Sequence, residues 1–386
     1  MFLDRLIATN APLAELALSW AADGVILPDT YLIDLDMIEK NARAMQSAAD
    51  ARSIALYFML KQFGRNPLVG KRLAELEFAG AVCVDYREAL VLLEAGVPLA
   101  HVGHLVQTPR AALGRILESR PHKMTVYSVE KAAEIGAEAA AQGFIQPIML
   151  RVIGPDDVLY PGQYGGFSLK ELPQTIDELE KIKGIRLAGA CSFPCMLFST
   201  ETLDVEPLPN AFTVRAAAEQ LRERGYDSIE LNMPSNSCVH TVELVSTLGG
   251  THMEPGHGLS GTTPYHAAHS DAAEGIGYAY VSEVSHNLGG HAYCYGGGHY
   301  RRGHTATALI GRSLDKACRT HVITPADENI DYYFELSNEA EVGDPVLMCF
   351  RTQMFVTRSR VAVVSGLSQG VPHLEGLFDT QGHQIG

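Results

Sequence analysis

Between residues 31 and 271, short apolar runs alternate with longer segments whose apolar residues stand three or four positions apart. The short runs predict buried strands, and the longer segments predict amphipathic helices. After a strand at Tyr31–Leu35 and a helix around Met37–Ala49, eight further strands are predicted at Ile54–Leu60, Ala81–Val84, His101–Val106, Lys123–Tyr127, Pro147–Ile153, Arg186–Cys191, Ser228–Leu231 and Thr251–Met253. Eight strands separated by helices indicate an α/β fold, a closed (β/α)8 TIM barrel over residues 31–271.

After about residue 272 the pattern changes to β-rich runs separated by glycine turns. These runs are Tyr278–Ser285, His291–Tyr295, Thr305–Ile310, Tyr332–Leu336, Pro345–Cys349, Met354–Val356 and Val361–Val364. They predict a C-terminal all-β domain over residues 272–386. Residues 1–30 are predicted to form a helix followed by a proline-containing segment, both of which pack with this β domain.

Composition narrows the class of protein. The net charge of −15 and the scattered basic residues argue against a nucleic-acid partner. We expect neither a membrane span nor a secretion signal, since no apolar stretch reaches the required length and the first residues lack a basic region followed by an apolar core. Seven cysteines without the tight spacing of a disulfide-rich module favour a reducing cytoplasm, and Cys191 and Cys195 are interpreted as small buried residues.

Lys61 closes the first predicted barrel strand and is the leading candidate for chemistry. A lysine at the end of a buried strand is either a tolerated end residue or a nucleophile, whose neutral amine forms a Schiff base with an aldehyde cofactor. The working groups of a barrel lie at the carboxyl ends of its strands. The other strand ends supply further candidates, which one pocket could collect: Arg151, Ser192, Asn236, Ser237 and Glu254.

A second motif, Glu254-Pro255-Gly256-His257-Gly258, follows the last predicted barrel strand. It is either a plain turn relaxed by its glycines or a cofactor site. In the second interpretation the backbone amides around Gly256 and His257 face a phosphate, and the Glu254 side chain points toward a ring nitrogen. Ser237 could add a hydroxyl to the same phosphate.

Lys61, Asn236-Ser237 and Glu254-Pro255-Gly256, on eight β/α units followed by a β domain, resemble the alanine racemase and ornithine decarboxylase superfamily of fold type III pyridoxal phosphate enzymes. The resemblance covers about residues 27–366. The segments Glu254–Pro264 and Gly297–Arg302 are most similar to the YhfX-like branch, whose members are usually labelled amino-acid racemases.

This resemblance implies pyridoxal 5'-phosphate as the cofactor, bound covalently through Lys61. The other residues implied at the cofactor are Arg151, Ser192, Asn236, Ser237, Glu254, Gly256 and His257. By this resemblance, the residue that corresponds to Glu254 is an arginine in the racemases and a glutamate in the decarboxylases. A carboxylate there favours a protonated ring, which suits loss of either a proton or carbon dioxide from Cα.

We therefore expect an enzyme acting at Cα of a small amino acid, most simply a racemase, with a decarboxylase or a non-catalytic cofactor carrier as alternatives. Racemisation by two bases needs a group on each face of the substrate. Lys61 can serve one face. For the other, the superfamily uses the β domain of a partner subunit, so Tyr300, His299 and Cys349 are the candidates and a homodimer with shared sites is expected.

Two segments depart from the family pattern. Tyr164 stands where the racemases carry an arginine near the cofactor, and Arg151 is the candidate substitute. Arg351 and Gln353 stand where the related D-serine dehydratases carry the His and Cys of a zinc site, so no metal is expected there. The chain has nine histidines between residues 240 and 304, which suggest metal binding as an alternative to the cofactor site. This alternative is not favoured, because the histidines lack recognised metal-ligand spacings.

Overall fold

The computed structural model describes all residues, 1–386, and the chain divides into two compact units. Unit 1 comprises Met1–Ala42, Lys61–Val69 and His257–Gly386, and unit 2 comprises Arg43–Leu60 and Gly70–Gly256. Lys61 and His257, two of the expected cofactor residues, are thus each the first residue after a boundary between the units. The domain boundaries expected from the sequence stay a prediction.

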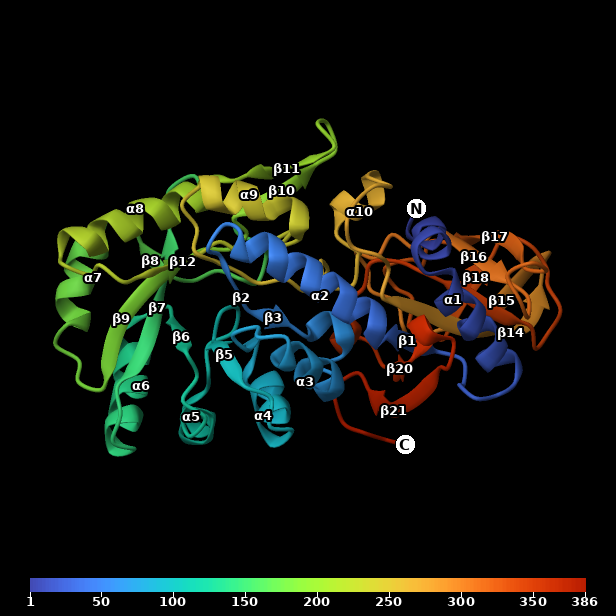
Figure 1. Ribbon diagram of the computed structural model, residues 1–386, viewed down its shortest axis with the longest axis horizontal. Coiled ribbons are helices and arrows are strands. Elements are labelled where there is room, and N and C mark those ends of the chain that lie inside the picture. Colours follow the sequence, from blue (N-terminus) through green and yellow to red (C-terminus); the bar gives the residue numbers. More distant parts are fainter. The chain divides into compact units, whose positions relative to one another are not determined.

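Unit 2 is a closed parallel barrel, which confirms the predicted fold class (Figure 1). Its strands run in the order β2-β13-β12-β9-β7-β6-β5-β4-β3. The segments β2 and β3 are two halves of one strand interrupted at Tyr57, and they pair with β13 and β4 respectively, so the sheet closes on itself. The strand bounds are β2 Ala55–Leu56, β3 Phe58–Met59, β4 Ala81–Cys83, β5 Leu99–Val102, β6 Lys123–Val126, β7 Gln146–Ile153, β9 Ile185–Cys191, β12 Glu230–Asn232 and β13 His252–Met253.

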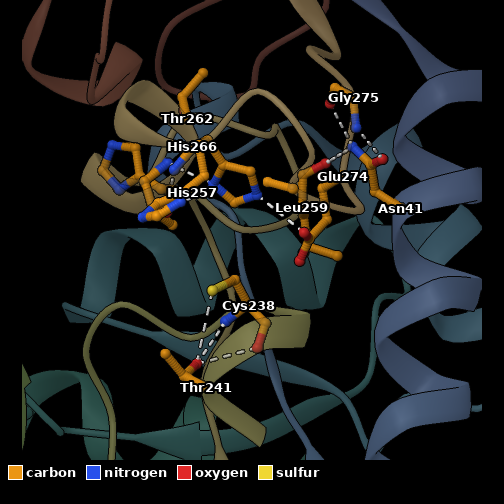
Figure 2. A network of polar contacts seen from close by, with 12 residues as sticks. Asn41, Cys238, Thr241, His257, Leu259, Thr262, His266, Glu274 and Gly275 are labelled. Atoms are coloured by element: carbon orange, nitrogen blue, oxygen red, sulfur yellow. Dashed lines mark hydrogen bonds and ion pairs between the residues drawn. The ribbon is translucent and has the colours of Figure 1, made fainter. Parts of the chain in front are cut away.

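Helices connect these strands in the expected alternation: α2 Leu35–Asp50, α3 Pro67–Glu75, α4 Tyr86–Glu94, α5 Arg110–Leu117, α6 Val129–Ala141, α7 Leu172–Leu179, α8 Pro209–Glu223 and α9 Val239–Thr247. Polar side chains define several helix starts. Asp85 accepts from the Glu88 amide at the start of α4, and at the start of α9 Thr241 Oγ1 accepts from the Cys238 amide at 3.0 Å (Figure 2). Each such contact satisfies a backbone donor that the helix itself leaves unpaired.

Three short strands of unit 2 were not predicted. β8 (Phe167–Ser168) pairs with the end of β7, and β10 (Met196–Ser199) and β11 (Asp204–Pro207) form an antiparallel hairpin. The hairpin is inserted between β9 and α8 and begins at Met196, shortly after Ser192. It therefore extends one of the strand-end loops in which candidate residues are expected.

Unit 1 is built on a nine-stranded sheet in the order β15-β18-β17-β16-β19-β14-β1-β20-β21. The bounds are β1 Thr30–Asp34, β14 Tyr278–Leu288, β15 His291–Tyr295, β16 Thr307–Ile310, β17 Cys318–Ile323, β18 Tyr333–Leu336, β19 Pro345–Met348, β20 Arg360–Ser365 and β21 His373–Asp379. The opening strand, β1, pairs antiparallel with β14 and parallel with β20 in this sheet. Helix α1 (Phe2–Ala22) packs its apolar side chains into the same hydrophobic core.

The sequence pattern was wrong at Met354–Val356, which forms a 3-10 turn rather than a strand, and it missed β17 and β21. β17 alternates exposed and buried residues and begins with exposed Cys318 and Arg319, so its apolar pattern is weak. No helix of the chain combines the length and the apolar character that crossing a membrane requires.

Asn41, on α2, joins two loops of unit 1 by buried hydrogen bonds. Its amide nitrogen donates to the carbonyl oxygens of Leu259 and Gly275, each at 2.8 Å, and its amide oxygen accepts from the Gly275 amide at 2.9 Å (Figure 2). Asn41 is 1% exposed. Water therefore cannot replace these bonds when the side chain is removed.

We expect Asn41→Ala to lower the free energy of unfolding by about 2–4 kcal/mol, because it leaves buried backbone groups unpaired. Asn287→Ala is the matched control, since Asn287 makes a similar pair of bonds to the backbone of Ala340 in an exposed position. Water can replace those bonds, so the control should lose less than about 1 kcal/mol. Urea unfolding of both variants checks this, and equal losses would contradict it.

Candidate functional site

Glu254 lies at the centre of a buried polar cluster in the barrel. It directly follows β13, and its Oε1 accepts a hydrogen bond from His101 Nδ1 at 2.7 Å and another from Asn232 Nδ2. His101 comes from β5 and Asn232 from the end of β12, so strands distant in sequence converge on one carboxylate. His104 adds a second ring, with Nε2 3.6 Å from Glu254 Oε2.

The surroundings keep Glu254 ionised. Burial raises the pKa of this carboxyl, but the nearby His104 and His101 rings and the hydrogen bonds from His101 and Asn232 outweigh burial and lower it to about 2. Because a carboxylate only accepts hydrogen bonds, His101 carries its proton on Nδ1, and its Nε2 faces the hydroxyl of Thr125. The barrel thus holds a buried negative charge at a strand end.

The buried oxygen atoms near the strand ends that have no hydrogen-bond partner within the chain include Asn232 Oδ1 and two others, Glu254 Oε2 and Ser237 Oγ. Buried polar atoms are nearly always paired, so these two are suited to a ligand. An aromatic nitrogen that carries a proton fits the first, and an anion fits the second. The residues present therefore match the two ends of pyridoxal phosphate.

The loop that carries Ser237 has an unusual backbone. Ser235 and Asn236 both have positive φ, at 105° and 47°, which is uncommon for residues other than glycine. The side-chain Nδ2 of Asn236 donates to the Met196 carbonyl of the β10–β11 hairpin at 3.2 Å, and Thr241 Oγ1 donates to the backbone carbonyl of Asn236. These contacts hold Ser237 immediately before the Cys238 cap of α9, where the first amides of the helix favour an anion.

Arg151, near the end of β7, is fully buried and held on several sides. Its guanidinium donates to Tyr127 Oη at 3.0 Å and to the Gln163 carbonyl at 3.1 Å, and it stacks over the Tyr127 ring at 5.1 Å. Tyr164, which the resemblance places at the arginine position of the racemases, is 67% exposed. Arg151 thus contacts Gln163, the residue next to Tyr164.

Ser192, just after β9, is buried and already engaged, since its hydroxyl accepts from Asn210 Nδ2 at 3.1 Å. It orients the segment that leads to the hairpin. A direct role at the cofactor stays a prediction for Ser192, as it does for Gly256.

In unit 1, Lys61 begins a 3-10 turn and is 8% exposed. His257 of the same unit hydrogen-bonds through Nε2 to the Thr352 carbonyl at 2.8 Å and through Nδ1 to the side-chain Nε2 of Gln62 at 3.3 Å. Burial, followed by the charges of Arg351 and Lys61, holds the pKa of His257 well below its usual range. The ring is therefore neutral and committed to protein partners, which leaves its backbone amide as the group suited to a phosphate.

The three candidates for a second acid/base group differ in their surroundings. Tyr300 is half-buried, and its hydroxyl accepts from Gln353 Nε2 at 3.2 Å. His299 is half-buried, and burial lowers its pKa. Cys349 belongs to the hydrophobic core of unit 1, where burial raises the pKa of its thiol well above the usual range. This core position favours a packing role for Cys349 and leaves Tyr300 as the better-placed group.

His101, His104 and Asn232 were not among the predicted site residues. The run His101–Val106 predicts a buried strand, and this interpretation does not single out its two histidines as strand-end groups. The same strand-end argument that selected Arg151 could have found His104. Of the histidines between 240 and 304, His266 is buried and paired with Glu274 at 2.9 Å (Figure 2). Its ring is also hydrogen-bonded to the Thr263 hydroxyl, which indicates a structural role.

Comparison with known proteins agrees with this architecture. The family model described as alanine racemase, N-terminal domain, matches residues 33–264, and the model described as YhfX-like, C-terminal domain, matches residues 279–374. The uncharacterized protein YhfX of Escherichia coli (strain K12) is 42% identical over 387 residues, which is 100% of both chains.

Solved structures share the fold at low sequence identity. Alanine racemase of Clostridium difficile 630 in complex with cycloserine is 18% identical, with 92% of this chain and 99% of that chain covered and a TM-score of 0.66. D-threonine aldolase from Filomicrobium marinum is 14% identical, with 93% and 96% covered and a TM-score of 0.63. D-threo-3-hydroxyaspartate dehydratase from Delftia sp. HT23 is 18% identical, with 91% and 96% covered and a TM-score of 0.65.

The two family matches together extend over both predicted domains, and the full-length relative has the same order of parts. The resemblance expected from the strand-end residues is thereby confirmed. The chain belongs to the alanine racemase-like, fold type III superfamily of pyridoxal phosphate proteins, in its YhfX-like branch.

Proposed function

We propose that this protein is a pyridoxal phosphate enzyme that acts at Cα of a small amino acid, as a racemase. The observation that carries the proposal is Glu254, a buried carboxylate that keeps Oε2 without a hydrogen-bond donor at a barrel strand end. When bound, pyridoxal phosphate withdraws electrons from Cα of an attached amino acid and so makes its bonds easier to break.

Each group of this chain has a separate role in the proposal. Lys61 holds the cofactor covalently and serves as one acid/base group. Glu254 Oε2 would accept a proton-bearing ring nitrogen, while its Oε1 stays bonded to His101 and Asn232. Ser237 Oγ and the backbone amides of Gly256 and His257 would bind the phosphate, and Arg151, Ser192 and Asn236 would shape the remaining wall.

The proton on the second face would come from Tyr300. Its hydroxyl accepts a hydrogen bond from Gln353, so its own proton is available for donation. In the superfamily such a group comes from the β domain of the partner subunit. We therefore propose a homodimer in which each active site uses Lys61 of one subunit and Tyr300 of the other.

A decarboxylase is the second candidate, and the observation that favours it is the same Glu254. A glutamate in this setting resembles the decarboxylases, whereas the racemases carry an arginine there. Structures named as an aldolase and a dehydratase share the fold, so the fold alone leaves the reaction open. Incubation with a panel of amino acids discriminates the two: the racemase releases no carbon dioxide and exchanges the Cα proton with deuterium from solvent.

We expect the purified protein loaded with pyridoxal phosphate to show a visible absorption band that borohydride abolishes, because borohydride reduces the bond between Lys61 and the cofactor. Lys61→Ala should lack the band. Lys71→Ala, an exposed lysine on α3, is the matched control and should keep it. A band that survives in Lys61→Ala would refute the role of Lys61.

We expect Tyr300→Phe to slow deuterium exchange at Cα by about 10²–10⁴-fold for one enantiomer of the substrate, since it removes one acid/base group. The cofactor band should persist. Tyr295→Phe, on β15, is the control and should exchange normally. Full exchange by Tyr300→Phe would remove Tyr300 from the mechanism without affecting the assignment of Lys61.

Mixing the inactive Lys61→Ala and Tyr300→Phe variants tests whether the site is shared. Random reassembly into dimers gives one intact site in half of the molecules, so about a quarter of wild-type activity should return. No recovery after subunit exchange, verified by mass spectrometry of the mixed dimer, would show that each subunit uses its own Tyr300 or none.

A further inference from the structure

Three side chains inside the barrel carry metal-binding chemistry, and the proposed function assigns none of them a direct contact with cofactor or substrate. His101, His104 and Cys191 each offer one ligand atom, and the three atoms all lie within 4.8 Å of one another. All three side chains are fully buried. They come from β5, from the loop after β5 and from the end of β9, so the barrel itself brings them together.

The hydrogen bonds around His101 already have the pattern of a metal-binding histidine. Its Nδ1 donates to Glu254 Oε1 at 2.7 Å, which directs the lone pair of Nε2 away from the carboxylate. Metal-binding histidines almost always donate their other ring proton to a carboxylate, carbonyl or water, which sets the tautomer and the ring orientation. Glu254 thus supplies the acceptor that a metal ligand at His101 requires.

Thr125 marks the position between the ligands. Its hydroxyl is hydrogen-bonded to His101 Nε2 and lies 3.7 Å from Cys191 Sγ. The imidazole nitrogen and the sulfur therefore face the same small polar atom. A rotation of the Thr125 side chain would leave these two ligand atoms directed at a shared point.

The spacing suits a small ion. Zinc binds imidazole nitrogen at about 2.0–2.1 Å and thiolate sulfur at about 2.3 Å in tetrahedral geometry, which places ligand atoms about 3.4–3.6 Å apart. The separations here, all below 4.8 Å, need side-chain adjustments on the order of 1 Å at most.

We propose that His101, His104 and Cys191 form a three-ligand site for one zinc ion, with Glu254 accepting a hydrogen bond from His101 and the fourth coordination position not filled by these side chains. Two imidazoles and a thiolate select zinc or cobalt over magnesium and calcium, which prefer oxygen ligands. Cys191 binds as the thiolate, and its proton is released to solvent. An open fourth position is the arrangement of catalytic rather than structural zinc sites.

This site is separate from the segment around Arg351 and Gln353, which lies in unit 1. It adjoins the proposed cofactor site at Glu254, whose Oε2 lies 3.6 Å from His104 Nε2, but the two sites use different ligand atoms. Glu254 uses Oε1 toward His101, and Oε2 is the atom proposed for the ring nitrogen. Zinc binding can therefore be tested in a chain that has lost its covalent cofactor.

The experiment is a cobalt titration of the full chain after removal of metals by a chelator, in the wild type and in Lys61→Ala. Cobalt replaces zinc in tetrahedral sites and reports its ligands by absorption. We expect one equivalent per chain to give intense visible bands of tetrahedral cobalt and a near-ultraviolet band of a cobalt–thiolate bond. Absence of the thiolate band in both chains overturns the proposal.

Two cysteine variants assign the sulfur ligand. Cys191→Ser should lose the cobalt–thiolate band, and Cys195→Ser should keep it, because Cys195 is equally buried but donates to the Ser192 carbonyl instead. A band that survives in Cys191→Ser, with circular dichroism showing a folded chain, overturns the assignment. If Cys191→Ser does not fold, the wild-type titration still decides whether a thiolate site exists.

Glu254→Gln tests the hydrogen bond that Glu254 accepts from His101. It should weaken zinc affinity by about 10–100-fold, as loss of such an acceptor typically does. Zinc affinity is measured by competition with a chromophoric chelator. An unchanged affinity in Glu254→Gln refutes the supporting role of Glu254. Failure of the proposed function would appear differently, as loss of the borohydride-sensitive band in the wild type with the cobalt spectrum intact.

Discussion

The ionised carboxylate of Glu254 is the interaction around which the barrel interior is organised. A buried charge costs several kcal/mol unless partners compensate it, and an ordinary barrel fills this space with layers of aliphatic side chains. Here His101, His104 and Asn232 come from two other strands to meet the carboxylate. Because a carboxylate occupies this place, the neighbouring strands must supply hydrogen-bond donors rather than aliphatic side chains.

A second polar cluster at the starts of the strands shows the same rule. Glu230 opens β12 and is paired with Lys123, which opens β6, at 2.6 Å, and it accepts from Tyr57 Oη at 2.9 Å. None of the polar atoms of Glu230, Lys123 or Tyr57 is buried without a hydrogen-bond partner. The cluster at the strand ends differs because Glu254 Oε2 and Ser237 Oγ are left over. That difference agrees with the general placement of barrel active sites at the carboxyl ends of the strands.

The sequence pattern predicted the architecture well because buried parallel strands are short apolar runs, and their number alone implies closure. It could not predict which sheet receives β1, since the partners of that strand, β14 and β20, lie about 250 and 330 residues away. His101 and His104 were missed for a related reason. A polar residue that points into a barrel looks like a break in an apolar run until the strands around it are known. Cys349 shows the converse, because a plausible reactive residue turned out to lie in the core.

The choice between a racemase and a decarboxylase depends on the groups that face Cα, and Glu254 does not decide it. With a pKa of about 2, this carboxyl keeps its charge throughout the physiological pH range, so it can assist the loss of either a proton or carbon dioxide. Proton transfer on a second face requires a group that can donate. Tyr300 meets this requirement, because Gln353 donates to its oxygen and leaves the phenolic proton available. Gln353, which the family resemblance places at a zinc-ligand position of the D-serine dehydratases, donates to Tyr300 in this chain. This hydrogen bond from Gln353 to Tyr300 is the local feature that supports the proposed proton transfer at Cα.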